Sequence, residues 1–155
     1  MPRIEHSFKA MGGPCRLRIE SADEARARPA IEDAVAEVQR LELKYSRYLH
    51  DSLTTRINRA AGSGEAVSID AETAGLLHYA RTVWEQSNGL FDLTSGVLRR
   101  AWDFRSQSLP ARAEIDALLP LVGWGKVEWD QESVKLPSPG MEIDFGGVVK
   151  EYAAD

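Results

Sequence analysis

The sequence is poor in the features that mark several large classes of protein. Cys15 is its single cysteine, so no internal disulfide can form. Its apolar runs are too short to span a bilayer, and its first ten residues lack the basic segment and apolar run of a signal peptide. These absences predict a soluble chain, cytoplasmic as given, with no direct membrane segment.

Excess basic charge and closely spaced histidines are also missing. Lys and Arg total 19 against 24 Asp and Glu, a formal net charge of -5. An acidic chain gains little from displacing the counterions of a phosphate backbone, so we expect no nucleic-acid partner. The three histidines, His6, His50 and His78, do not have the spacing of zinc ligands.

What remains is typical of a folded domain. The chain has 155 residues, of which 43% are hydrophobic, and no repeat, linker or low-complexity tract divides it. This length supports one domain with its own core, so residues 1–155 are expected to form a single unit.

Hydrophobic periodicity predicts the first elements. Alternating apolar and polar residues indicate strands at 4–9 and 15–20. From 23 to 45 the apolar residues recur three or four apart, which predicts an amphipathic helix, with Pro29 in its first turn or at an early boundary. Asp70 is a good cap for a second long helix, and Gly89 suits its C-terminal end.

The rest of the chain mixes short strands and helices. We expect a helical piece through residue 58, a strand at 65–69, helices at 95–104 and 112–119, a hairpin at 127–129 and 134–136, and a strand at 141–145. This order predicts an α+β fold, an antiparallel sheet flanked by the helices at 23–45 and 70–88. A last helix starts near residue 148 and stops after about two turns, which suggests a chain truncated within a helix.

The segment 142–150 carries the strongest local chemical signal. Asp144 is followed by the pair Gly146-Gly147, and a helix is expected to begin around Lys150. Paired glycines let the backbone approach a ligand, and the amide-rich start of a helix suits a phosphate, to which Lys150 would add charge. Asp144 is suited to accept a ribose hydroxyl or a base N–H. On the residues alone, a tight turn with a surface lysine is the simpler interpretation.

The segment 87–94 is the second candidate. A helix ends, the chain turns at Gly89, and Asp92 and Thr94 follow Phe91 closely. Backbone N–H groups after such a turn suit the edge of a planar ring system. The simpler interpretation is a capped helix followed by a core phenylalanine, with Asp92 or Thr94 capping the next helix.

Other acidic residues offer no catalytic pair. The glutamates at positions 72, 85, 114 and 128 are expected to be charges that face solvent, and no catalytic residue is assigned. Tyr45 is expected to finish the apolar stripe of the first long helix, although a tyrosine beside a polar loop can also stack on a flavin.

Taken in order, these segments resemble the family of FAD:protein FMN transferases, also called the ApbE family. The matching residues are Met11-Gly12, Tyr45-Ser46-Arg47-Tyr48 with Ser52 and Asn58, Gly89-Leu90-Phe91-Asp92-Leu93-Thr94, Trp102, and Asp144 through Ala153. Each motif is weak alone, but five in this order are specific. The resemblance spans essentially the whole chain. It implies an ApbE-like (T-fold-like) half-domain that is incomplete at its C-terminus.

The resemblance implies an enzyme that uses FAD and Mg²⁺ and transfers FMN to a threonine of an acceptor flavoprotein, typically a subunit of a membrane redox complex. By position, the residues that would contact FAD are Met11, Tyr48, Leu90, Phe91, Asp92, Asp144 and Lys150. Gly147 would offer its carbonyl to the metal. Many members of the family are exported and lipid-anchored, which differs from the cytoplasmic location expected for this chain as given.

Two departures from the family pattern affect these expectations. Glu151 stands where the family usually has glycine, beside the expected phosphate site. The family's metal-binding carboxylate and threonine belong to a C-terminal half that this sequence does not contain, so the chain alone is expected to be inactive.

Two alternatives remain, a flavin- or nucleotide-binding module without catalysis and a fragment that does not fold stably. If the chain folds, apolar surface left exposed where the other half would dock predicts a homodimer or aggregation.

Overall fold

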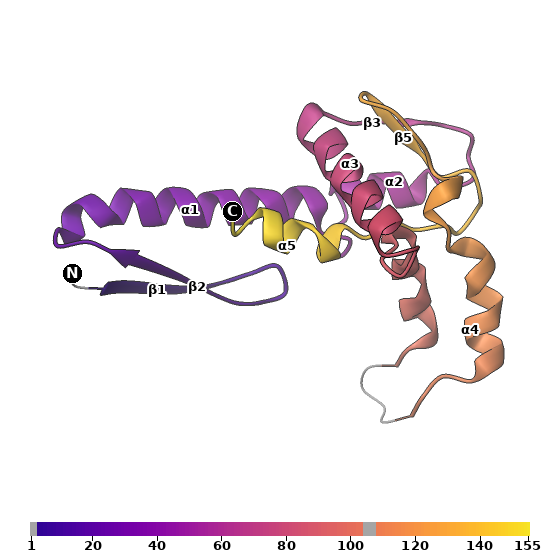
Figure 1. Ribbon diagram of the computed structural model, residues 1–155, viewed down its shortest axis with the longest axis horizontal. Coiled ribbons are helices and arrows are strands. Elements are labelled where there is room, and N and C mark those ends of the chain that lie inside the picture. Colours follow the sequence, from indigo (N-terminus) through magenta and orange to yellow (C-terminus); the bar gives the residue numbers. More distant parts are fainter. Residues whose placement is uncertain (1–2, 104–107) are drawn as a thin grey trace.

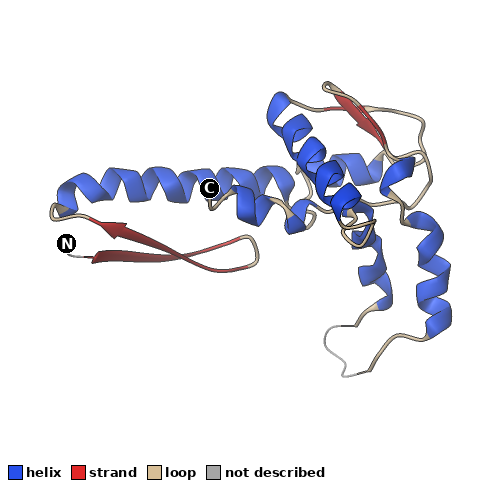
Figure 2. Cartoon of the chain, in the orientation of Figure 1, coloured by secondary structure: helices blue, strands red, loops and turns tan. Residues whose placement is uncertain are grey.

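Two long helices organise the chain in the computed structural model, which describes residues 3–103 and 108–155. Helix α1 spans Glu24–Tyr45 and helix α3 spans Ala71–Gln86. In Figure 1, α1 extends away from the other helices with a β-hairpin alongside it, and the remaining elements gather around α3. Helices and small sheets are both present, as Figure 2 shows, which confirms the predicted α+β class.

The hairpin consists of β1 (Arg3–Ala10) and β2 (Gly13–Glu20), which pair antiparallel over their whole length. Both strands were predicted. The turn between them contains only Met11 and Gly12, whose φ angles are 52° and 78°. A two-residue hairpin turn of this kind requires positive φ at both positions, which is easy for glycine and strained for methionine. The hairpin therefore holds Met11 in an unfavourable backbone conformation at its tip.

Helix α1 begins where it was predicted to begin. The carboxylate of Asp23 accepts hydrogen bonds from the N–H groups of Ala25 and Arg26. Pro29 lies inside the helix rather than at a boundary, so that part of the prediction was wrong. Pro29 is the sixth residue of α1, beyond the first turn whose N–H groups have no partner within the helix, so it removes one backbone hydrogen bond from the helix. Leu41 and Tyr45, at the C-terminal end, are buried in the core.

Side chains cap two further helices, and the cap at Asp70 was predicted. Ser52 caps α2 (Leu53–Arg59), and Asp70 caps α3 through the N–H of Thr73. Beyond the end of α3, Gly89 has a φ of 79°, the left-handed conformation that the sequence suggested.

The expected sheet is divided into two. Besides the β1–β2 hairpin there is a three-stranded antiparallel sheet, β3 (Val67–Ser68), β5 (Ser133–Lys135) and β4 (Glu128–Trp129), in that spatial order. Its β4–β5 pair confirms the predicted hairpin.

Short 3₁₀ helices replace some of the expected elements. The helix expected at 95–104 is the 3₁₀ helix η1, Leu93–Ala101, and residue 104 lies outside the described residues. The α-helix α4 (Arg112–Leu118) ends one residue before its predicted bound, and the 3₁₀ turn η2 (Leu119–Leu121) follows it. A further turn, η3 (Trp124–Lys126), leads into β4.

The strand predicted at 141–145 does not form. Met141, Ile143 and Phe145 are completely buried, as the alternating pattern suggested, but their backbone pairs with no strand among the described residues. Ile143 instead bonds with the side-chain amide of Asn58, at 2.8 Å through its N–H and 3.0 Å through its carbonyl. Alternation of apolar and polar residues predicts that one face of a segment is buried. It does not specify which groups form hydrogen bonds with the backbone of that segment.

The segment ends at the edge of the core in two short helices. These are the 3₁₀ turn η4 (Phe145–Gly147) and the single-turn helix α5 (Val149–Tyr152). Phe145 is fully buried and its ring packs against that of Tyr45, with centroids 5.0 Å apart. None of the helices in the described part of the chain has the length and apolarity that crossing a bilayer demands.

Candidate functional site

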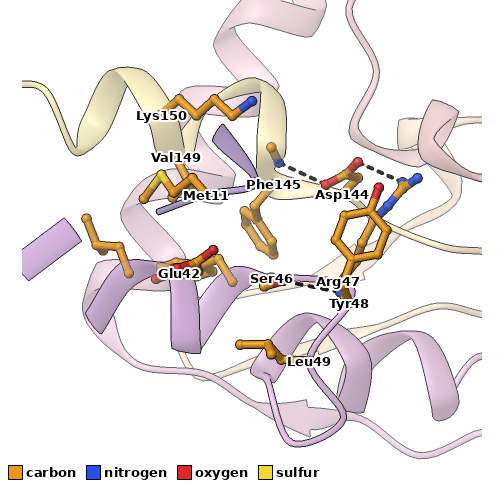
Figure 3. Close-up of a pocket in the computed structure, with 14 residues that line it drawn as sticks. Met11, Glu42, Ser46, Arg47, Tyr48, Leu49, Asp144, Phe145, Val149 and Lys150 are labelled. Carbon is orange, nitrogen blue, oxygen red and sulfur yellow. Dashed lines mark hydrogen bonds and ion pairs between the residues drawn. The ribbon is translucent and has the colours of Figure 1, made fainter. Parts of the chain in front are cut away.

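A cavity of about 470 Å³ opens where three distant segments meet (Figure 3). One wall is the end of α1 with the loop that follows it, another is the tip of the hairpin, and the third is the segment 144–150. The lining residues are Met11, Gly12, Leu41, Glu42, Tyr45, Ser46, Arg47, Tyr48, Leu49, Asp144, Phe145, Gly146, Val149 and Lys150. Four of the residues predicted to bind FAD therefore share one cavity: Met11, Tyr48, Asp144 and Lys150.

Met11 reaches the cavity because of its left-handed backbone at the hairpin tip. Its side chain is half-buried, packs against the edge of the core, and lies close to Val149 in Figure 3. Strained residues that are not glycine are concentrated at functional sites, where the surrounding structure maintains them. The hairpin thus supplies an apolar, flexible side chain to this wall.

Tyr48 offers an open aromatic face. It is 83% exposed, and its ring lies over the guanidinium of Arg47, whose Cζ is 5.4 Å from the ring centroid. Its backbone N–H donates to the Ser46 hydroxyl at 3.2 Å. A ring supported on one side and exposed at the other is suited to stack on a planar ligand.

Asp144 stands at the mouth of the cavity between two partners. One carboxylate oxygen accepts from the N–H of Gly146 at 2.9 Å, which caps η4. The other accepts from Nη1 of Arg47 at 2.7 Å, and both bonds are drawn in Figure 3. The carboxylate keeps 31% of its side chain exposed, so it remains accessible to a ligand.

Lys150 lies in the single turn of α5 and is exposed at the cavity. Within residues 3–103 and 108–155 its ammonium forms no ion pair. The helix that carries it is shorter than predicted, and the 3₁₀ turn η4 precedes it. Positive charge at this position therefore comes mainly from the lysine itself.

Of the other predicted contacts, Phe91 packs against the Gly146-Gly147 turn from the side away from the cavity. A Cβ at Gly147 would lie 2.9 Å from the ring of Phe91, so this ring packs directly against the turn. The N–H of Asp144 donates to the carbonyl of Leu93 at 2.9 Å, which joins the two candidate segments. Leu90 is 92% exposed and does not line the cavity.

The carboxylate of Asp92 is engaged in holding loops together. One oxygen accepts from the N–H and the hydroxyl of Thr94, and the other accepts from the N–H of Trp124 at 2.8 Å. The N–H of Gly123 in turn donates to the Thr94 hydroxyl at 2.7 Å. The expectation that Asp92 or Thr94 caps the next helix is confirmed for Asp92.

The metal ligands expected at this site are incomplete. Mg²⁺ prefers six oxygen ligands, and the carbonyl of Gly147 would supply one. No group of three His, Cys, Asp or Glu residues that would hold a metal ion exists in the described part of the chain. These residues alone therefore do not fit a magnesium site.

Three residues to which the sequence assigned no role help to build the site. Arg47 lies within the quoted motif, but its neighbouring tyrosines attracted the assignment. Asn58, also in the motif, fixes the segment before Asp144 through Ile143. Gly96 allows Asp144 and Arg47 to approach, and no pattern in the sequence indicated this.

Glu151 points away from the cavity. It lines a separate hollow between α3 and α5, together with Tyr79 and Tyr152. The replacement of the family's glycine therefore places its negative charge outside the cavity that Asp144 and Lys150 share.

Glu72, expected to face solvent, is instead the centre of a polar cluster. Only 20% of its side chain is exposed, and it accepts from Arg40, from Lys44 at 2.6 Å and from Tyr152 at 3.3 Å. The Arg40 guanidinium, with Lys44, lowers the pKa of the Glu72 carboxyl to about 2. The cluster links α1, α3 and α5, the helix that carries Lys150.

Comparison with known proteins gives a consistent result. The model of the ApbE family matches residues 11–155. The chain is 32% identical over 154 residues to a protein of Klebsiella pneumoniae (strain 342) named FAD:protein FMN transferase, and the alignment covers 97% of this chain and 47% of that protein.

Solved structures share the fold. An ApbE protein of Thermotoga maritima superposes with a TM-score of 0.85 at 28% identity, over 98% of this chain and 50% of that one. A flavin transferase ApbE of Vibrio cholerae gives 0.84 at 18% identity, a likeness of fold alone, over 99% of this chain and 54% of that one. The chain thus spans about half the length of these relatives.

Proposed function

Because this chain belongs to the ApbE family, we propose that it forms the FAD-binding part of an FAD:protein FMN transferase. One observation carries the proposal: Met11, Tyr48, Asp144 and Lys150, which come from three distant segments, line a single cavity. Its volume of about 470 Å³ is within the range of small-molecule sites.

Each lining group has a role that suits the ligand. The flavin ring stacks on the exposed face of Tyr48, with Met11 as an apolar contact. Lys150 neutralises part of the pyrophosphate charge, and Asp144 accepts a hydrogen bond from a ribose hydroxyl or a base N–H. Phe91 packs against the turn at Gly147 from the other side, and Leu90, Phe91 and Asp92 are proposed to contact the dinucleotide from there.

The reaction proposed for the whole protein is transfer of FMN to a threonine of an acceptor flavoprotein, such as a subunit of a redox complex. The threonine hydroxyl oxygen attacks the phosphorus on the FMN side of FAD, loses its proton, and displaces AMP by breaking the pyrophosphate bond. Positioning and charge neutralisation supply most of the catalysis in such transfers. The described residues offer Lys150 for neutralisation but no group of three His, Cys, Asp or Glu side chains for Mg²⁺, so we propose that further metal ligands come from outside these residues.

Equilibrium binding tests the FAD site directly. The chain is titrated into FAD, and flavin fluorescence is followed with and without Mg²⁺. We expect saturable quenching, because a flavin stacked on Tyr48 loses its emission. No binding under either condition would overturn the proposed site.

A second candidate function, a flavin-binding module without catalysis, is favoured by the missing cluster of metal ligands among the described residues. The same titration separates the two functions. Mg²⁺-independent affinity supports the module, and tighter binding with Mg²⁺ supports the transferase.

Covalent labelling tests catalysis. The chain is incubated with FAD, Mg²⁺ and an acceptor domain, and protein-bound flavin is measured by in-gel fluorescence and mass spectrometry. We expect no labelling by the 155-residue chain and labelling by a full-length relative used as a positive control. Robust labelling by the chain alone would contradict its dependence on ligands from outside.

A further inference from the structure

We propose that Arg47 is the positioning residue of the FAD site, a buried guanidinium that fixes the carboxylate of Asp144 and supports the ring of Tyr48 in one arrangement. The inference rests on the proposed FAD-binding function. It assigns a role to a side chain that neither composition nor motif had distinguished from its neighbours.

The contacts of Arg47 join three parts of the chain. Nη1 donates to the Asp144 carboxylate at 2.7 Å and to the carbonyl of Gly96 at 3.3 Å, while the guanidinium lies under the ring of Tyr48. Arg47 and Asp144 are 97 residues apart in sequence. One side chain thus links the loop after α1, the η1 helix and the turn at the cavity mouth.

Burial makes this link stronger than a surface ion pair. Only 10% of the Arg47 side chain is exposed, against 31% for Asp144. Exposed ion pairs contribute little because water screens them, but removing one partner of a buried pair leaves an uncompensated charge.

Arg47 also carries an unsatisfied donor. Its Nε is buried and has no hydrogen-bond partner among the described residues. A buried donor without a partner lowers stability, and such groups in folded proteins call for a functional or ligand-related explanation. Since Arg47 lines the cavity, the arrangement is consistent with a side chain kept for binding rather than for stability.

Gly96 provides independent support. A Cβ at this position would lie 2.8 Å from Cβ of Asp144 and 2.9 Å from Nη1 of Arg47. Any larger residue would therefore push Asp144 and Arg47 apart. Glycine, which has no Cβ, is the residue that permits their contact at this position of η1.

The physical consequence concerns charge at the cavity mouth. With Arg47 in place, the carboxylate of Asp144 is neutralised and oriented, so it can accept a hydrogen bond without repelling the FAD pyrophosphate. Without Arg47 the same carboxylate keeps only its hydrogen bond from the N–H of Gly146 and presents an unpaired negative charge to a negative ligand.

A double-mutant cycle tests the proposal, with FAD affinity as the readout. We expect Arg47→Met to weaken FAD binding roughly tenfold and Arg47→Lys to recover part of the loss, since lysine keeps the charge but not the planar fork. If Arg47 acts through Asp144, the double variant R47M/D144N binds no more weakly than the weaker single variant. If the double variant instead loses FAD affinity by the product of the two single-variant factors, the positioning role of Arg47 is overturned.

Two further variants separate positioning from folding. Gly96→Ala keeps both charges but forces the pair apart, and we expect it to weaken FAD binding as well. Gly75→Ala, where a Cβ would meet no heavy atom within 4 Å, is its control and should bind FAD normally. Arg112→Met removes an exposed ion pair with Asp116 and is the control for R47M.

The outcomes distinguish this inference from the proposed function. If the unchanged chain does not bind FAD, the FAD site itself is refuted. If it binds and R47M binds equally well, only the role of Arg47 is refuted. If circular dichroism shows R47M to be unfolded, R47K and G96A decide, and normal FAD affinity in both would refute the role.

Discussion

Lys150 is the cavity cation whose ammonium remains open to a ligand, whereas Arg47 is engaged with Asp144. We expect Lys150→Met to weaken FAD binding roughly tenfold, the size of one lost charge-assisted contact. Because the side chain is exposed, added salt should reduce the affinity of the unchanged chain and have less effect on the variant.

The matched control for this prediction is Lys135→Met. Lys135 belongs to the three-stranded sheet and pairs with Glu128 at 2.8 Å, away from the cavity lining. Equal FAD affinity in the two lysine variants would show that Lys150 does not contact the pyrophosphate.

Single residues show how far sequence reasoning reached at the site. Motif matching named seven contacts to FAD, of which Met11, Tyr48, Asp144 and Lys150 line one cavity and three do not, and contact with FAD stays a prediction for all seven. It gave no information on Arg47, because a guanidinium next to a tyrosine in a loop has the same local signature whether it is solvated or buried. Its partner lies 97 residues away, and only tertiary packing brings the two together.

At the level of elements, the polar cluster around Glu72 joins α1, α3 and α5. The pKa of Glu72 is lowered from its ordinary value of 4.5 to about 2, first by its hydrogen bond to Arg40. Because the folded pKa lies below the unfolded one, this stabilisation is complete above pH 4.5 and is lost as the pH falls toward 2.

We therefore expect Glu72→Gln to lower the melting temperature at neutral pH and to make stability less dependent on pH in that acidic window. Thermal unfolding followed by circular dichroism measures both effects. The control is Glu85→Gln on the same helix, whose exposed pair with Arg81 should contribute little. An equal fall in melting temperature in the two variants would contradict the central role of Glu72.

Helix α2 determines the position of the segment that leads to Asp144. Its Asn58 makes two hydrogen bonds to the backbone of Ile143, which is fully buried. We expect Asn58→Ala to lower the free energy of unfolding by about 2 kcal/mol, because it leaves a buried N–H and carbonyl without partners. Urea denaturation measures the loss.

Arg59→Ala, an exposed substitution one residue further along α2, is the control for Asn58. Wild-type stability in the Asn58 variant would show that water replaces the amide at no cost.

The elements themselves were predicted unevenly, for physical reasons. The hairpin and the long helices each repeat one pattern of apolar and polar residues over many positions, and the long helices also begin at capping residues, Asp23 and Asp70. Local sequence therefore specifies these elements. The segment 141–145 alternates like a strand, but a side chain of α2 takes the place of a partner strand. Helix η1 was predicted as a helix without its type, because the three-residue repeat of a 3₁₀ helix is close to the three-to-four-residue spacing of an α-helix.

For the whole molecule, the exposed apolar surface leads to a prediction about association. Among residues 3–103 and 108–155, the large apolar side chains with at least half of their surface exposed are Leu43, Tyr48, Tyr79, Leu90 and Leu109. We expect the chain to self-associate, and sedimentation velocity over a range of concentrations would detect it as a rising sedimentation coefficient.

The substitution Leu43→Ser, on the exposed face of α1, should weaken this association, and Leu109→Ser tests the exposed segment before α4. A chain that remains monomeric at every concentration would contradict the prediction of a homodimer.

The wide sequence separation of the cavity walls also sets the order in which the site can be completed. Two walls are encoded by residues 11–49, but the third requires the chain through Lys150. During synthesis the first two walls emerge from the ribosome together with the long helix that joins them, and roughly a hundred residues must follow before Asp144 can meet Arg47. If the proposed FAD site is right, we expect a nascent chain to acquire affinity for the dinucleotide late, when closure of that long loop adds the final wall.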